Sequence, residues 1–181
     1  MKILLSLIVI AIMGCGEPRN NFVMLVTVNN ESSDQLKLTL ETLTAEVNEA
    51  LRCDVIAPLK SNGKRRVIEL KYDDVRLKEM SEPNTSTLGA YLDNRFVPYA
   101  NEEIIFQSTL ASQFRGLRLH GVMLHELGHA LGLEHEEGSI MSEQYDRTYN
   151  KTSAQMESFK SLIQKYGLNP CDIPGYSSPV N

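Results

Sequence analysis

The sequence predicts one domain of the α+β class, and three features of the chain indicate it. Its 181 residues, 42% of them hydrophobic, are enough to bury one sizeable core but not two. Short β-branched runs and longer segments with helical spacing of apolar residues follow one another. The sequence contains no internal repeats or low-complexity tracts. The expected order is strand, helix, three strands, helix, irregular chain and a terminal helix.

The first part of the chain is predicted to contain two strands and one long helix. Residues 22–28 are apolar and β-branched, which is typical of a buried strand. Ser33 or Asp34 can cap a helix that runs to about Arg52. Turn-forming residues then precede a second strand over residues 66–72. The helix has apolar residues on one face at Leu36, Leu40, Leu43, Val47 and Leu51.

The second part is predicted to contain two more strands and two helices. A short third strand lies within residues 88–97, and a fourth covers residues 102–107. A helix follows over about residues 116–131. The last helix covers about residues 152–167, and Gly167 is its expected C-cap.

One motif carries most of the chemical information. From His125 to His135 the chain reads H-E-x-x-H-x-x-G-x-x-H. On a helix of about 100° per residue, His125 and His129 lie one turn apart on one face, so both imidazoles can reach one metal ion. Glu126 is turned about 100° away and can reach a water on that metal instead. Gly132 can end the helix, after which the chain returns with His135 as a third ligand. Three protein ligands leave a fourth position for water, as in catalytic zinc sites.

The alternative interpretation of this segment is an ordinary amphipathic helix whose polar residues face solvent. H-E-x-x-H alone occurs by chance, but three of the four histidines of the chain fall on the longer pattern. This concentration favours a site for one catalytic Zn²⁺ ion. The fourth histidine, His120, lies about 140° around the helix from His125. We expect it to be a surface or hydrogen-bonded histidine and not a ligand.

The motif resembles that of the metzincin zinc endopeptidases, and most of all the matrixins. Metzincins have a methionine turn shortly after the third histidine, and Met141 within Ser-Ile-Met-Ser at residues 139–142 matches it. The resemblance implies a zincin-like fold: a twisted mixed sheet of four or five strands, an active-site helix, a backing helix, and a small C-terminal subdomain ending in a helix. The peptidase domain would cover residues 22–170, divided into an upper part (22–132) and a lower part (133–170).

The resemblance also implies an activity and residue roles. The enzyme would hydrolyse peptide bonds of an extended polypeptide, with Glu126 as the general base that takes a proton from a zinc-activated water. Met141 would form an apolar floor beneath the histidines without binding zinc. Residues 102–107 would be the edge strand lining the cleft, where a substrate can add as a further strand. The alternative, which the sequence leaves open, is an ordinary interior strand or an edge strand blunted by charge.

The sequence departs from the family pattern in several places. Animal matrixins bind a second, structural zinc through upstream histidines, and only His120 is available here, so we expect one zinc. Glu136 directly follows the third histidine, as in astacin-type members, but Glu143 stands where those members have a tyrosine. Tyr145 and Tyr149 can support transition-state charge or pack in the loop beside the specificity pocket. The subfamily stays open.

The N-terminus predicts export and a lipid anchor. Residues 1–14 combine Lys2 with an apolar run shorter than the roughly 20 residues that span a bilayer. The run ends in Ile-Met-Gly before Cys15, which resembles the lipobox of a bacterial lipoprotein signal peptide. Cys15 would carry the lipid, and residues 15–21 would form a tether. A plain secretory signal is the alternative. By the same resemblance, the lack of an aspartate after Cys15 points to the outer membrane or cell surface.

An exported location permits the two remaining cysteines to pair. A Cys53–Cys171 bridge would connect the end of the first helix to the C-terminal tail, residues 171–181. Two free buried thiols are the alternative, and the sequence leaves both open. The neighbours of Cys53 match the zinc-binding propeptide motif of latent matrixins poorly.

Composition excludes one class of partner. The formal net charge is −5 and the pI is about 5.4, and no basic stripe is present to bind nucleic acid. The expected partners are a polypeptide substrate and, through the anchor, a membrane. Two other functions remain open: a lipid-anchored zinc-binding module without turnover, and a zinc amidase that acts on cell-wall peptide.

Overall fold

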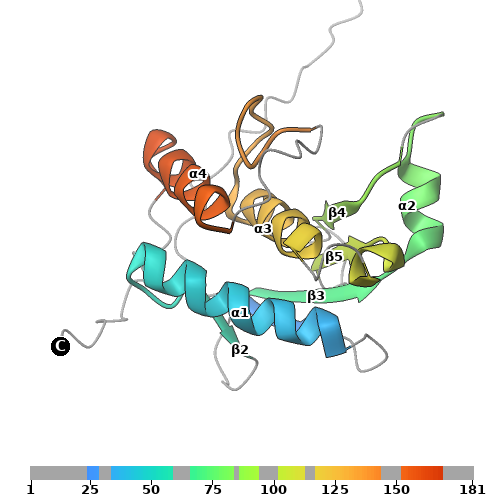
Figure 1. Cartoon of the computed structure of the whole chain (residues 1–181), viewed down its shortest axis with the longest axis horizontal. Coiled ribbons are helices and arrows are strands. Elements are labelled where there is room, and N and C mark those ends of the chain that lie inside the picture. The colour runs from blue at the N-terminus through green and yellow to red at the C-terminus, as the bar shows by residue number, and fades with distance from the viewer. Residues whose placement is uncertain are drawn as a thin grey trace, which may run out of the picture.

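The structure is a computed structural model, and it describes residues 24–28, 34–58, 66–83, 86–93, 102–112, 117–143 and 152–168. These residues form five β-strands, four α-helices and a short 3-10 helix (Figure 1). The predicted signal peptide, the lipid site at Cys15, the tether and the C-terminal tail lie outside the described residues. The mixed α+β class is confirmed.

The strands form one mixed sheet in the order β2-β1-β3-β5-β4. Strands β1 (Met24–Val28), β2 (Ile56–Pro58), β3 (Arg66–Tyr72) and β5 (Glu102–Phe106) pair in parallel. Strand β4 (Gly89–Leu92) pairs with β5 in the antiparallel sense. Parallel neighbours need a crossover connection, and helix α1 provides the one between β1 and β2.

Helix α1 (Asp34–Leu51) buries the apolar face that the sequence predicts. Its last turn is connected to β2 by the side-chain amide of Asn48. The Asn48 amide nitrogen donates to the Ile56 carbonyl (2.8 Å), and its oxygen accepts from the main-chain nitrogens of Val55 (2.9 Å) and Ile56 (3.0 Å). One side chain thereby satisfies three main-chain groups where the helix ends.

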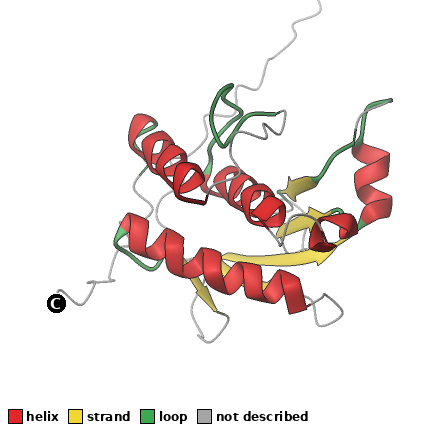
Figure 2. Cartoon of the chain, viewed as in Figure 1, coloured by secondary structure: helices red, strands yellow, loops and turns green. Residues whose placement is uncertain are grey.

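Helices α3 (Leu117–Leu131) and α4 (Thr152–Lys165) pack against each other and against α1 (Figure 1). The strands lie next to α1 and α3 (Figure 2), so the core continues from the sheet into the three-helix contact. Helix α3 is covered on several sides, and most of its side chains are buried. The helix that carries the motif is therefore held firmly in the core.

Three short elements are not predicted from the sequence. They are β2, helix α2 (Asp74–Met80) and the 3-10 helix η1 (Ser108–Ser112). Their three to seven residues are too few to show a clear hydrophobic period. The start of α2 did have a local signal, because the Asp73 side chain caps it by accepting from the main-chain nitrogen of Arg76 (3.1 Å).

The prediction that residues 102–107 form the edge strand is wrong. Strand β5 lies between β3 and β4, and β4 is the strand at that edge of the sheet. The reason is visible in the burial of β5, because Ile104, Ile105 and Phe106 are all 0% exposed. Consecutive buried residues require cover on both faces, which is typical of an interior strand. The sheet is therefore extended by Gly89–Leu92, a shorter strand with half-buried residues.

Two further observations concern Cys53 and membrane-spanning helices. Cys53 is disulfide-bonded, and the partner predicted for it, Cys171, lies outside the described residues. Within the described part of the chain, no helix is long and apolar enough to cross a membrane.

Candidate metal centre

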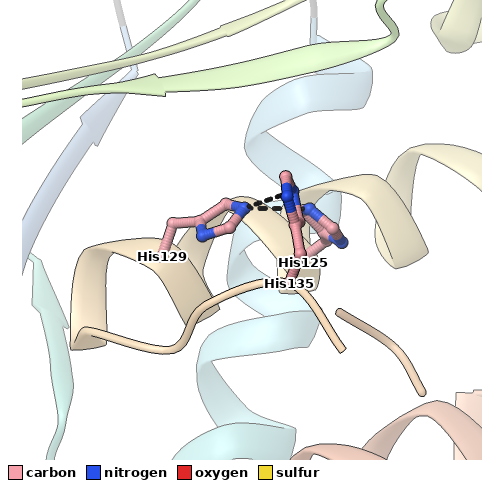
Figure 3. A group of neighbouring side chains, drawn as sticks. All are labelled: His125, His129 and His135. Carbon is pink, nitrogen blue, oxygen red and sulfur yellow. Dashed lines mark hydrogen bonds between the residues drawn. The ribbon is translucent and has the colours of Figure 1, made fainter. Parts of the chain in front are cut away.

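The three histidines of the motif converge on one point. The Nε2 atom of His129 lies 3.1 Å from the Nε2 atoms of both His125 and His135. Figure 3 shows the three rings turned toward one another, with His125 and His129 on one helix and His135 on the segment that follows. These are the ligand atoms of a group that can hold a metal ion.

The main chain explains why His135 returns to the other two. Helix α3 ends at Leu131, and the next residue, Gly132, has a φ of 98° in the left-handed region that favours glycine. The nitrogen of Leu133 then donates to the carbonyl of Gly128 (2.9 Å), which closes the helix C-terminus. The predicted helix end at Gly132 is confirmed, and three residues later His135 faces the other two rings.

Main-chain carbonyls orient two of the rings. The Nδ1–H of His125 donates to the carbonyl of Ile140 (2.8 Å), and the Nδ1–H of His129 donates to that of Leu133 (2.9 Å). Burial, as the largest effect, lowers the pKa of His125 to about 4 and also lowers the pKa of His129. Both rings are therefore neutral at pH 7, with the proton on Nδ1 and a lone pair on Nε2.

This donor set fits a zinc ion. Two neutral imidazoles that both carry their proton on Nδ1 cannot form a hydrogen bond between their Nε2 atoms, so the 3.1 Å approach of His125 and His129 places two lone pairs together. A cation between them satisfies both. Tetrahedral zinc with bonds of about 2.05 Å requires nitrogen atoms about 3.3 Å apart. His125 and His129, whose Nδ1 atoms are hydrogen-bonded to main-chain carbonyls, also match the usual environment of zinc-binding histidines.

Glu126 lies beside the histidines and beneath the edge strand. Its side chain is 5% exposed and accepts a hydrogen bond from the main chain of Tyr91 in β4. A Cβ on Gly89 would come within 3.2 Å of Glu126 Oε1, which shows how closely β4 approaches this carboxylate. Burial raises the pKa of Glu126 to about 8, although the hydrogen bond from Tyr91 lowers it. A divalent cation nearby favours the ionised carboxylate.

The segment around Met141 packs against the helix that carries the motif. Met141 is 0% exposed, and its sulfur packs against Gly128 of α3. The turn is held by its own residues and by α4. Ser139 Oγ accepts from the nitrogen of Met141 (3.0 Å), and Ser158 Oγ accepts from the nitrogen of Ile140 (2.9 Å). The same Ile140 residue orients His125, so the turn acts directly on a candidate ligand.

A cavity of about 1060 Å³ opens over these groups. The three histidines and Glu126 form one part of its wall, and β4 with the segment before it forms another. Arg118 and Val122 precede the histidines on α3 and also line the cavity, as does Met80 at the end of α2. The candidate metal centre and the edge strand thus line one cleft.

The other residues singled out in the sequence have different positions. His120 is 5% exposed and hydrogen-bonded to Glu46 and Gln155, so it is a satisfied interior histidine and not a surface one. Tyr145 and Tyr149 lie outside the described residues. Sequence reasoning missed Gly89 and Tyr91, and no local signal reveals them, because their contact with Glu126 depends on how β4 packs against α3.

Fold and site together define an α+β domain with a cluster of three histidines that can hold a metal ion, in a cleft. The family model Peptidase_M10, described as matrixin, matches residues 70–167, which is more than half of the chain. The chain belongs to the matrixin family. Membership identifies it at the family level as a zinc metallopeptidase, a hydrolase with a polypeptide substrate.

The resemblance expected from the motif is therefore confirmed at the level of the family. The matched region begins in β3 and ends just after α4, so it contains the edge strand, the histidine motif and the methionine turn. No curated protein matches the chain.

Proposed function

We propose that this protein is a zinc-dependent endopeptidase that cleaves extended polypeptides with Glu126 as general base. The observation that carries the proposal is the position of Glu126. Its buried carboxylate accepts a hydrogen bond from the edge strand β4 and lines the same cleft as the three converging imidazoles. His125, His129 and His135 would hold the metal.

Different residues of the chain would have different roles in the reaction. Zinc, when bound, supplies a Lewis acid that polarises a carbonyl and increases the acidity of water. Glu126 would take the proton from the attacking water and deliver it to the leaving amine. The carbonyls of Ile140 and Leu133 hold the imidazoles of His125 and His129 in the orientation needed for binding. Met141 fills the space beneath the site and excludes water there.

The proposed substrate is a polypeptide in extended conformation. Strand β4 is at the edge of the sheet and lines the cleft. An edge strand offers main-chain groups to which another extended segment can add. Strand β4 therefore takes the substrate-binding role that the sequence assigns to residues 102–107.

The experiment that tests the proposal is digestion of a mixed peptide library by the zinc-loaded protein, with products identified by mass spectrometry. We expect internal cleavage that stops with a chelator and returns when zinc is added. Glu126→Ala and Glu126→Gln should retain zinc, measured as one ion per chain, and reduce cleavage by more than about 100-fold, the general-base contribution.

The result also separates the two alternative functions. Stoichiometric zinc without cleavage of any peptide would support a binding module and contradict the proposal. Release of amino groups from cell-wall peptide, with the linear peptide library left intact, would support the amidase. Cleavage by Glu126→Ala at the parent rate would remove Glu126 from the mechanism.

We also propose that the enzyme is exported and anchored by lipid at Cys15, at the outer membrane or cell surface of a bacterium. The sequence Ile-Met-Gly before Cys15, after a short apolar run, supports this. Labelling of the full chain with a radioactive fatty acid should mark the wild type and not Cys15→Ser. Equal label in both, or an unlabelled wild type, would contradict the anchor.

A further inference from the structure

We infer that Glu136 is a positioning residue for His135, which it holds in place through a clasp to the end of helix α4. The clasp consists of Glu136, Lys165 and Tyr166. The inference rests on the zinc site of the proposed function but concerns metal binding and not cleavage. It assigns a role to Glu136, which directly follows the motif and takes no part in the proposed mechanism.

His135 needs such support more than the other two histidines do. His125 and His129 each donate an Nδ1 hydrogen bond to a main-chain carbonyl. Among the described residues, no such bond restrains Nδ1 of His135. His135 is also the exposed member of the group, whereas the other two are half-buried on a helix. Its position must therefore be fixed through the main chain on which it stands.

The clasp joins that main chain to α4 at a single oxygen atom. Glu136 Oε2 accepts a hydrogen bond from Lys165 Nζ (2.6 Å) and another from the hydroxyl of Tyr166 (2.9 Å). Lys165 Nζ also lies 5.4 Å from the centre of the Tyr166 ring, within cation–π range. Glu136 directly follows His135, so an anchor on its side chain acts one residue from the ligand.

Both donors belong to a well-fixed part of the fold. Helix α4 buries Phe159, Leu162 and Ile163 in the core. Its end is closed by Gly167, which has a φ of 61°, and by a hydrogen bond from the nitrogen of Leu168 to the carbonyl of Ile163 (3.0 Å). The main chain of Lys165 and Tyr166 is therefore held by a capped and packed helix end.

The main chain of Glu136 is also hydrogen-bonded to the methionine turn. Its nitrogen donates to the carbonyl of Met141 (3.0 Å), and its carbonyl accepts from Ser139 Oγ (2.7 Å). Glu136 thus connects three parts of the site: His135 before it, the turn after it, and α4 beside it. An isolated surface ion pair contributes little, but one built into such a network restrains geometry.

The test measures zinc affinity and metal geometry in Glu136→Ala and Tyr166→Phe. We expect Glu136→Ala to raise the zinc dissociation constant about tenfold, a typical effect of losing an outer support of a metal ligand. Tyr166→Phe should have a smaller effect. Glu136→Gln keeps an oxygen that can accept from Tyr166, and should recover part of the affinity. The absorption bands of the Co²⁺-substituted protein should change in Glu136→Ala, because they report the ligand arrangement.

Lys160→Met provides the matched control. It removes an exposed ion pair of the same helix, between Lys160 and Glu157 (3.2 Å), that does not involve the residue after His135. This variant should bind zinc as the wild type does. Equal zinc affinity and an unchanged Co²⁺ spectrum in Glu136→Ala would overturn the inference, as would an equal loss of affinity in Lys160→Met.

The outcome of this zinc-binding test does not depend on whether the protein cleaves peptides. If the protein binds zinc but cuts no peptide, the proposed function fails, while a weakened zinc site in Glu136→Ala still supports the clasp. If the wild type cleaves peptides and Glu136→Ala binds zinc normally, the proposed function stands and the clasp is rejected.

Discussion

Gly128 and Met141 are in direct contact, and a Cβ on Gly128 would overlap the sulfur of Met141. The contact joins the middle of the histidine motif to the turn beneath it. Gly128 lies between Glu126 and His129, so its missing side chain allows the helix to approach the turn closely. The glycine is required here for space and not for backbone conformation.

The first prediction follows from this contact. Gly128→Ala should lower the free energy of unfolding by about 1–3 kcal/mol, the usual cost of overpacking, and should weaken zinc binding because Met141 must move. Urea unfolding and zinc competition would measure both effects. In a Met141→Ala background the added methyl has room, so the penalty for Gly128→Ala should shrink. An equal penalty in both backgrounds would show that the contact is not the cause.

The second prediction concerns the contact between the edge strand and Glu126. A Cβ on Gly89 would lie 2.7 Å from Val122 Cγ1 and 3.2 Å from Glu126 Oε1. Gly89→Ala should therefore displace β4 or the carboxylate and lower kcat/KM by about tenfold or more, since small misplacements of reacting groups are costly. Zinc content should be unchanged. Wild-type kinetics in this variant would mean that β4 moves without affecting the catalytic geometry.

The third prediction concerns the buried histidine between three helices. His120 of α3 is hydrogen-bonded to Gln155 Oε1 of α4 (2.9 Å) and to Glu46 Oε2 of α1 (2.7 Å). His120→Ala should cost about 1–3 kcal/mol of stability, because a buried amide and a carboxylate each lose a hydrogen bond. Lys160→Ala removes only a pair with the exposed Glu157 and should change stability by less than about 0.5 kcal/mol. Thermal and urea unfolding of both variants would measure the difference.

The fourth prediction concerns pH and the ion pairs of Glu103. Burial by itself would raise the pKa of Glu103, but hydrogen bonds and positive charge from Lys71 and Arg76 outweigh it and hold the pKa below its usual value. A carboxyl with a lowered pKa in the folded state adds stability above its unfolded pKa of about 4.3. That stability disappears as the pH falls through the folded pKa.

The measurement is the free energy of unfolding of wild type and Glu103→Gln between pH 7 and pH 3, both in chelator. The wild type should be the more stable at pH 7, and the difference should shrink below about pH 4.3. Lys71→Met removes one of the positive partners, so the pH dependence should be weaker in that background. A difference that stays constant with pH would exclude the ion pairs as its source.

Much of the fold can be predicted from the sequence because its long elements have a strong hydrophobic period. Helix α1 and strand β3 begin and end within a residue or two of the predicted bounds, and α3 does so as well. The pairing of strands is not readable in the same way. Strand β5 follows β4 in the chain but lies between β4 and β3, since pairing is decided by contacts between residues far apart in sequence.

The same distinction between local structure and contacts across the chain applies to the site. The convergence of His125, His129 and His135 can be predicted because the three are held by one helix and its end, which are local structures. The support of the site cannot be predicted, because it comes from other elements. Tyr91 reaches Glu126 from the sheet, and Lys165 and Tyr166 reach Glu136 from α4.

The short distance in sequence between the three histidines affects how zinc stabilises the fold. All three lie within the segment from His125 to His135, so an unfolded chain can bring them together at a small entropic cost of loop closure. The denatured protein should therefore keep some affinity for zinc. Metal that binds both states stabilises the folded one only by the difference in affinity. Saturating zinc should raise the unfolding temperature less than the folded-state dissociation constant alone implies.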